Sequence, residues 1–171
     1  ITELSVIVER FTRDSEHDED VRMVVTQRIR DLLICAEDAD FASAGLELFD
    51  DERDVAVVAR SAANEEVAEE AVHRIGNDKL LGAVARRSKH VAVARSALGR
   101  LTDSQELCSV AIKADDKLVA REAYDRLVSD KDELPDKLLQ EIARRSSHKT
   151  VARRARALVV ASESDKPQAP A

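Results

Sequence analysis

A nine-residue phrase that returns at a fixed interval limits the possible folds more than any other feature of this sequence. The chain reads VAEEAVHRI from Val67, VARSALGRL from Val93 and VAREAYDRL from Val119, so the phrase recurs every 26 residues. Self-similarity at a period of roughly 20 to 50 residues is typical of repeat proteins, in which each unit is one supersecondary element. The sequence therefore predicts an array of equivalent units.

The phrase has the spacing of one face of an α-helix, which we call the B helix of each unit. If its first residue is offset 0, apolar or small residues stand at offsets 0, 1, 4, 5 and 8, which share one side of a helix with 3.6 residues per turn. Small residues at offsets 1 and 4 favour close approach of a neighbouring helix. Offset 0 is occupied by Val67, Val93, Val119 and Val151, with Phe41 and Val21 as upstream matches.

A second short helix, the A helix, precedes the phrase in each unit. Equivalent alanines mark it at Ala59, Ala85, Ala111 and Ala143. The last interval is six residues longer than the others, and the extra residues fall within Ser129–Asp136, which predicts a longer loop there. A helix of about ten residues is marginal alone in water, so each hairpin must bury its apolar face on the next one.

These patterns predict an all-α fold, an α-solenoid of five to six stacked two-helix repeats of 26 residues. Residues 1–160 are expected to form this single domain, with Leu4–Ile29 as its most degenerate hairpin. Residues 161–171 are expected to form a disordered tail. The last B helix carries Arg156 at offset 5, as expected of a terminal unit whose outer face meets water.

The unit V-A-x-x-A-L-x-x-L after a short Leu/Ala helix resembles the short bacterial HEAT-like repeats. These include repeats of the phycobilisome-lyase type and the related leucine-rich-repeat variant. The resemblance covers roughly Leu4–Val160 and implies a right-handed superhelical stack that binds other macromolecules. The sequence lacks the iron–sulfur cysteine cluster of some repeat-variant proteins and the mid-repeat Pro or Asp pattern of long eukaryotic HEAT units.

The sequence contains no motif that favours an enzyme. It has no Gly-rich phosphate loop, nucleophile elbow or zinc-protease helix. His90 and His148 are expected to be exposed turn residues, and His73 is a third histidine without a catalytic neighbour. His17 lies among the acids of DSEHDED, where a metal site is a weak alternative to a solvated loop. We therefore expect a non-enzymatic protein without a cofactor or metal.

The cysteines and the hydropathy pattern bear on location. Cys35 and Cys108 are expected to be buried, reduced thiols, with a redox pair as the alternative, and no Cys-x-x-Cys pair is present to hold zinc. No apolar run approaches the roughly 18 to 20 residues of a membrane span, and the first ten residues do not resemble a signal peptide. These features predict a cytoplasmic protein.

Charge is distributed unevenly along the chain. Residues 1–85 contain 21 acidic and 9 basic residues, whereas residues 86–171 contain 13 acidic and 18 basic residues. In a stacked array, the arginines at offsets 2 and 7 would form rows along one side of the B helices. These candidate partner-binding residues are Arg74, Arg95, Arg100, Arg121, Arg126 and Arg153.

The arginine rows allow more than one interpretation. They can be a solvated face paired with neighbouring acids, or a groove that recognises an acidic protein segment or a nucleic-acid backbone. A HEAT-like DNA glycosylase would line its groove with aromatic residues, which make up only 2% of this chain. We expect a scaffold that binds another protein through its concave B-helix face. Nucleic-acid or other polyanion binding by the basic C-terminal repeats is the alternative, and a bilin-lyase-like enzyme is a third, weaker one.

Overall fold

The computed structural model describes residues 19–129 and 136–164, and every regular element within them is an α-helix. The all-α prediction is therefore confirmed for this part of the chain. The ten helices of the described residues are α2 (Glu19–Ile34), α3 (Ala39–Leu46), α4 (Glu52–Ser61), α5 (Glu65–His73), α6 (Asp78–Arg87), α7 (Val91–Arg100), α8 (Ser104–Lys113), α9 (Lys117–Ser129), α10 (Asp136–Arg145) and α11 (Lys149–Ser164).

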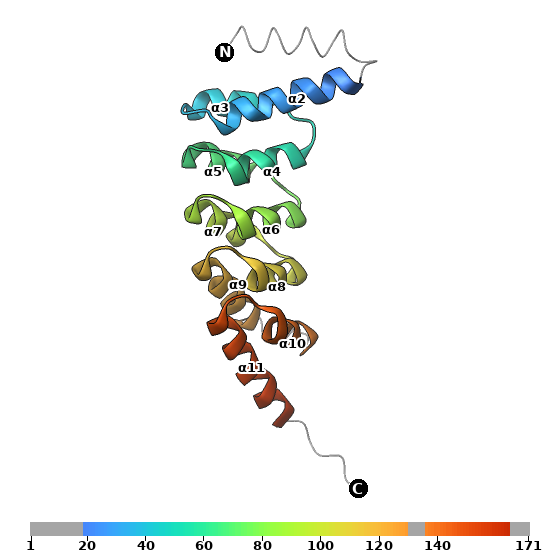
Figure 1. The fold of residues 1–171 in the computed structure, drawn as a ribbon, viewed down its shortest axis with the longest axis vertical. Coiled ribbons are helices and arrows are strands. Elements are labelled where there is room, and N and C mark those ends of the chain that lie inside the picture. Colours follow the sequence, from blue (N-terminus) through green and yellow to red (C-terminus); the bar gives the residue numbers. More distant parts are fainter. Residues whose placement is uncertain (1–18, 130–135, 165–171) are drawn as a thin grey trace.

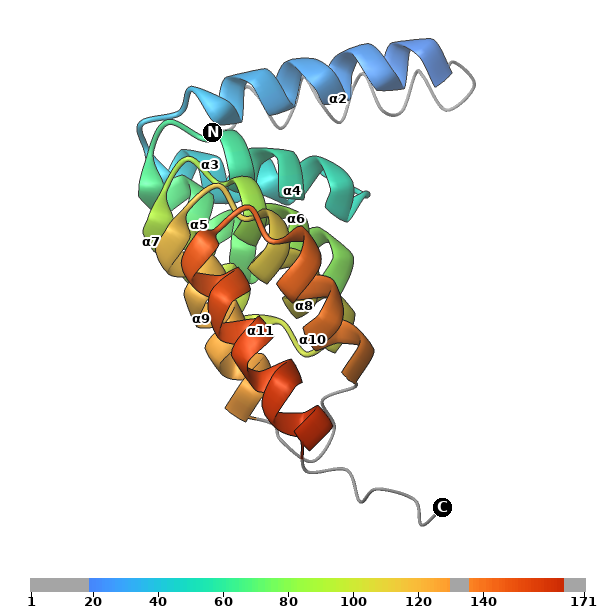
Figure 2. The same ribbon diagram turned by 60° about the horizontal axis from the view of Figure 1, so that its bottom comes forward.

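The helices form five hairpins that follow one another along the long axis of the molecule (Figure 1). Each hairpin pairs an even-numbered helix with the odd-numbered helix that follows it, from α2–α3 to α10–α11. The even-numbered helices pack on one another in one row, and the odd-numbered helices pack in a second row, as Figure 2 shows. The even row contains the predicted A helices and the odd row the predicted B helices.

One backbone hydrogen bond recurs between successive hairpins and fixes their register. A loop amide after each of α4, α6, α8 and α10 donates to a carbonyl near the end of the previous even-numbered helix, and the acceptors lie 26 residues apart. The pairs are Ala63 N to Ile34 O (2.8 Å), Lys89 N to Arg60 O (3.1 Å), Asp115 N to Arg86 O (2.9 Å) and Ser147 N to Ile112 O (3.0 Å).

This register places α2 in the A-helix row, because Ile34 is equivalent to Arg60. The prediction that Val21–Ile29 forms a B helix is therefore wrong. α2 packs on α4, and its buried residues are Ile29 and Leu33. The residues before Glu19, which include most of the predicted first hairpin and His17, lie outside the described residues.

The core follows the predicted offsets of the B helices. In α7 and the residue that follows it, Val93, Ala94, Ala97, Leu98 and Leu101 are all 3% exposed or less, and the equivalent residues in and after α5 and in α9 are buried too. Alanine at offsets 1 and 4 leaves room for neighbouring helices to pack closely. The tight fit between hairpins therefore depends on small side chains.

The α2–α3 hairpin meets the same need for space in a different way. Offset 4 of α3 is Gly45, and a Cβ atom added there would lie 2.6 Å from Cδ2 of Leu33. The buried Leu33 side chain thus occupies the volume that alanine occupies in the other units. The weaker sequence match of this unit reflects a different packing solution.

The last hairpin shows how the array ends. Arg156 is exposed at offset 5 of α11, and its Nε donates to Ala143 O of α10 at 3.0 Å. α11 continues to Ser164, so residues 161–164 of the predicted tail are helical. Residues 165–171 and the predicted longer loop at 130–135 lie outside the described residues.

The two cysteines differ in exposure, which corrects the prediction that both are buried. Cys35 is exposed just after α2, and Cys108 is buried in α8, and both are free thiols. Burial, together with the nearby Glu141 carboxylate, raises the pKa of the Cys108 thiol to about 11. The thiolate is the reactive form of cysteine. Cys108 is therefore protected from thiol reagents in two ways, because it is buried and because its thiol stays protonated.

We expect a thiol reagent at pH 8 to modify Cys35 in the native protein and to reach Cys108 only after denaturation. The higher pKa alone lowers the thiolate fraction of Cys108 on the order of 100-fold relative to an ordinary cysteine. Spectrophotometric thiol titration checks this result, with the reaction of Cys35 expected as a fast phase in the native protein. Cys35→Ser should remove this fast phase, and a fast phase that persists in the variant would contradict the buried position of Cys108.

Tyr124 is the largest of the fully buried side chains and lies at offset 5 of α9. Its hydroxyl has no hydrogen-bond partner within the described part of the chain, and burial raises its pKa. We expect Tyr124→Phe to stabilise the protein by about 1 kcal/mol, because it removes a buried, unpaired polar group. Urea denaturation followed by circular dichroism measures this change. A loss of stability would show that the hydroxyl makes a useful bond.

Candidate binding face on the B helices

The arginines at offset 7 hold neighbouring B helices together. Arg126 of α9 donates through Nη2 to Leu101 O at 2.9 Å and through Nη1 to Leu98 O, both at the C-terminal end of α7. Arg100 of α7 makes the same two contacts with α5, to Ile75 O at 2.7 Å and to Val72 O. Val72 O and Leu98 O also accept from the backbone amides of Ile75 and Leu101. Carbonyls at a helix C-terminus have spare acceptor capacity and lie at the negative end of the helix dipole, so they are favourable acceptors for a guanidinium.

Arg74, the third member of this row, forms side-chain contacts instead. Its Nε lies 3.1 Å from Oε1 of Glu70, and its Nη2 donates to Oγ of Ser43 at 2.9 Å. A carboxylate oxygen of Glu47 lies 3.7 Å from the same nitrogen. All three offset-7 arginines therefore link one B helix to the previous one.

The arginines at offset 2 are exposed and are paired to different degrees. Arg95 binds both carboxylate oxygens of Glu122 on α9, at 2.6 and 2.8 Å, and this contact raises the pKa of Arg95. Arg121 lies 3.6 Å from Asp125 one turn later on its own helix. Arg153 is exposed and forms no ion pair with any described residue. Of the six predicted arginines, Arg153 is the one whose side chain forms no hydrogen bond or ion pair with a described residue.

A regular ladder of contacts explains this pairing. Offset 2 of one B helix meets offset 3 of the next, as in the pairs Ser43–Glu70 (3.4 Å), Glu69–Ser96 and Arg95–Glu122. Between α9 and α11 both positions are arginines, Arg121 and Arg154. The Asp125 carboxylate lies between them, 3.6 Å from Arg121 and 2.7 Å from Arg154.

Sequence reasoning missed Arg154 as a residue with a defined position. Its guanidinium carbon lies 5.1 Å from the centre of the Tyr124 ring, within the range of a cation–π contact, and it also pairs with Asp125. The repeat register could have identified Arg154, because offset 3 of the other units carries the residue that contacts the previous B helix. The two contacts of Arg154 hold α11 against α9.

The two histidines predicted as exposed turn residues are partly buried, so that prediction is wrong. His90 Nε2 lies 3.0 Å from Ala62 O, and His148 Nε2 lies 2.7 Å from Ala114 O. A carbonyl oxygen only accepts, so Nε2 carries the proton in both contacts. Each imidazole joins the start of a B helix to the end of an A helix in the previous hairpin.

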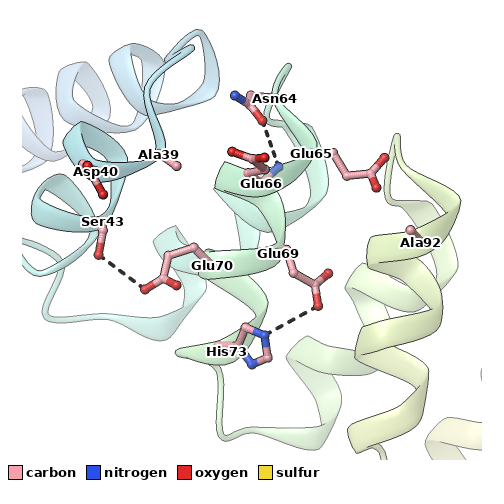
Figure 3. Close-up of a pocket in the computed structure, with 10 residues that line it drawn as sticks. All are labelled: Ala39, Asp40, Ser43, Asn64, Glu65, Glu66, Glu69, Glu70, His73 and Ala92. Atoms are coloured by element: carbon pink, nitrogen blue, oxygen red, sulfur yellow. Dashed lines mark hydrogen bonds and ion pairs between the residues drawn. The ribbon is translucent and has the colours of Figure 1, made fainter.

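A hollow of about 930 Å³ lies on the outward side of α3, α5 and the start of α7 (Figure 3). Offsets −2, −1, 2, 3 and 6 point away from the core on each B helix. In α5 these outward positions carry four glutamates and His73, and all five line the hollow. The other lining residues are Ala39, Asp40, Ser43, Asn64 and Ala92.

Several charged side chains on this outward side have no internal partner. Asp40 and Glu66 form no ion pair or side-chain hydrogen bond with other described residues, and Figure 3 shows both at the hollow. Glu65 contacts only the His90 ring, at 3.5 Å. At the other end of the row, Lys149 and Arg153 are exposed without an ion pair in the described ranges. The B-helix face therefore has free negative charge at one end and free positive charge at the other.

The described residues contain no group of three or more His, Cys, Asp or Glu side chains arranged to hold a metal ion. None of the helices in residues 19–129 and 136–164 is long and apolar enough to cross a membrane. Comparisons of the chain with protein-family models, curated proteins and solved structures gave no match.

Proposed function

We propose that this protein is a non-enzymatic α-solenoid scaffold that binds another protein through its B-helix face. The proposal includes a right-handed superhelix of the short HEAT-like type. It also includes a cytoplasmic location, because a reducing compartment keeps the exposed Cys35 thiol free. In such arrays the stacked helices form an extended surface for a partner.

The hollow across α3, α5 and α7 is the observation that supports this proposal most strongly. It joins three separate hairpins, and its lining residues do not contribute to the core between the helices. Free charge of both signs on the same face favours a protein partner, whose surface can carry both. A nucleic acid has uniform negative charge and would be repelled by the α3–α5 end.

Affinity capture from the cell of origin tests the proposal. The bait variant Glu66→Lys with Arg153→Glu alters two unpaired charges of the face without changing the net charge. Asp31→Lys with Lys79→Glu is the matched control, because both residues are exposed and unpaired on helices of the A row. We expect the first variant to lose a protein that the wild type and the control retain. Equal capture by all three baits would contradict a binding face on the B helices.

Polyanion binding by the last hairpin is a second candidate, favoured by a different observation. Arg144, Lys149 and Arg153 are exposed there without ion pairs among the described residues. Binding of this kind would weaken steeply with salt, because each phosphate contact releases counterions. Fluorescence anisotropy with labelled single- and double-stranded DNA and RNA at low salt distinguishes this candidate. Absence of binding by the wild type removes it.

A further inference from the structure

The outward positions of the B helices change sign along the row. Those of α3 and α5 carry acids and no Lys or Arg, and those of α7 carry Arg95 as their one charge. Those of α9 carry both signs, and those of α11 carry cations and no acid. Several of these charges form ion pairs within or between neighbouring B helices, including those of Glu70, Arg95, Glu122 and Arg154. The charges that remain free are Asp40 and Glu66 at the α3–α5 end, and Lys117, Lys149 and Arg153 on α9 and α11.

The middle of the same face carries exposed apolar residues at the starts of two helices. Val91 and Ala92 begin α7, and Leu118 is the second residue of α9, after the exposed Lys117; all are at outward offsets, and the three apolar side chains are exposed. Val91 is 41% exposed and Leu118 is 50% exposed, and both are among the most exposed large apolar side chains of the described residues. Ala92 also lines the hollow, so the apolar middle is continuous with the acidic end.

We propose that this face binds one segment of a partner protein whose charges are segregated. Cationic residues of the segment lie over α3 and α5, an apolar middle lies over Val91 and Leu118, and acidic residues lie over the start of α11. This inference rests on the proposed function and specifies the chemistry of the partner. It follows from charge complementarity along the face and from the exposed apolar residues between the two charged ends.

The spacing of the helices sets the length of such a segment. From α5 to α11 there are three steps along the B row, each about 8–10 Å, which gives a span of about 24–30 Å. An extended chain advances about 3.3 Å per residue, so about seven to nine residues cover this distance. A short linear segment therefore suffices to contact both charged ends at once.

Two synthetic peptides of identical composition test the inference. One has its lysines, apolar residues and glutamates in three consecutive blocks, and the other has the same residues interspersed. Both carry a fluorophore and capped ends, and binding to the full chain is followed by anisotropy at low salt. We expect the blocked peptide to bind at least about tenfold more tightly than the interspersed one, because only it pairs both ends of the face.

Single variants then locate the contact. Glu66→Lys and Arg153→Glu should each weaken binding of the blocked peptide by about tenfold, while Asp31→Lys with Lys79→Glu leaves it unchanged. Circular dichroism confirms that every variant is folded. Equal binding of the two peptides, or equal weakening by the control, overturns the inference. Sedimentation that shows a dimer abolished by Arg153→Glu also overturns it, since a second copy would then occupy the face.

The peptide assay and the capture experiment test separate claims, and either claim can fail without the other. If the blocked peptide shows no preference but the face variant still loses its cellular partner, the face binds protein and the proposed charge order is wrong. If the cellular partner is retained by the face variant, the proposed function is wrong whatever the peptides do.

Discussion

Ala97→Leu is expected to lower the free energy of unfolding by about 1–3 kcal/mol, since it overpacks a filled site. Ala97 is fully buried at offset 4 of α7, in the middle of the B row, and α5 and α9 pack on either side. The larger side chain can fit only if these helices move apart. Urea denaturation followed by circular dichroism measures the change. An unchanged midpoint would show that the B helices do not pack through this position.

Gly99→Ala in the same helix is the matched control. A Cβ atom added at Gly99 has no other atom within 4 Å, so the methyl group meets open space. Alanine is also the better helix former, and a gain of about 0.5–1 kcal/mol is expected. The two substitutions therefore differ in sign, although they lie two residues apart.

Arg126→Ala is expected to cost about 1–2 kcal/mol. It removes two charge-assisted hydrogen bonds to Leu98 O and Leu101 O, and the partial exposure of the guanidinium reduces the effect. Arg121→Ala, whose ion pair with Asp125 is 3.6 Å long and well exposed, is the comparison and should cost less than about 0.5 kcal/mol. Denaturation of both variants under one condition checks the difference. Equal losses would mean that the offset-7 arginines are ordinary surface residues.

Apolar periodicity was sufficient to predict the core of the B helices. Side chains at offsets 0, 1, 4, 5 and 8 share one face by helix geometry alone, and Val93, Ala97 and Leu101 are buried as expected. The interval of 26 residues also predicted the register of neighbouring hairpins. These features depend on local spacing, which a single sequence records.

The roles of the arginines could not be predicted in the same way. Arg95 and Arg100 both lie outside the apolar face of α7, yet Arg95 pairs with Glu122 and Arg100 binds carbonyls at the end of α5. The difference depends on which helix end lies within reach of each guanidinium, and this distance is set by packing. The hollow was missed for a similar reason, because it forms between three hairpins.

The placement of α2 shows a limit of side-chain patterns at the first unit. Val21 and Ile29 have the spacing of a B helix, but the hydrogen bond from Ala63 to Ile34 aligns α2 with the A helices. Backbone bonds leave no mark on side-chain composition. Cys35 and His90 were assigned the wrong exposure because turns, unlike helices, have no periodic pattern.

Site-directed photo-crosslinking in the cell of origin tests most directly whether the B-helix face binds a protein partner. A photoreactive amino acid replaces Ala92, which lines the hollow and is exposed, or Lys79 on the A row as the control. A binding face on the B helices predicts a discrete protein adduct from position 92 and none from position 79. Adding Glu66→Lys and Arg153→Glu should abolish the adduct. Equal crosslinking from both positions, or crosslinking from position 79 alone, would contradict it.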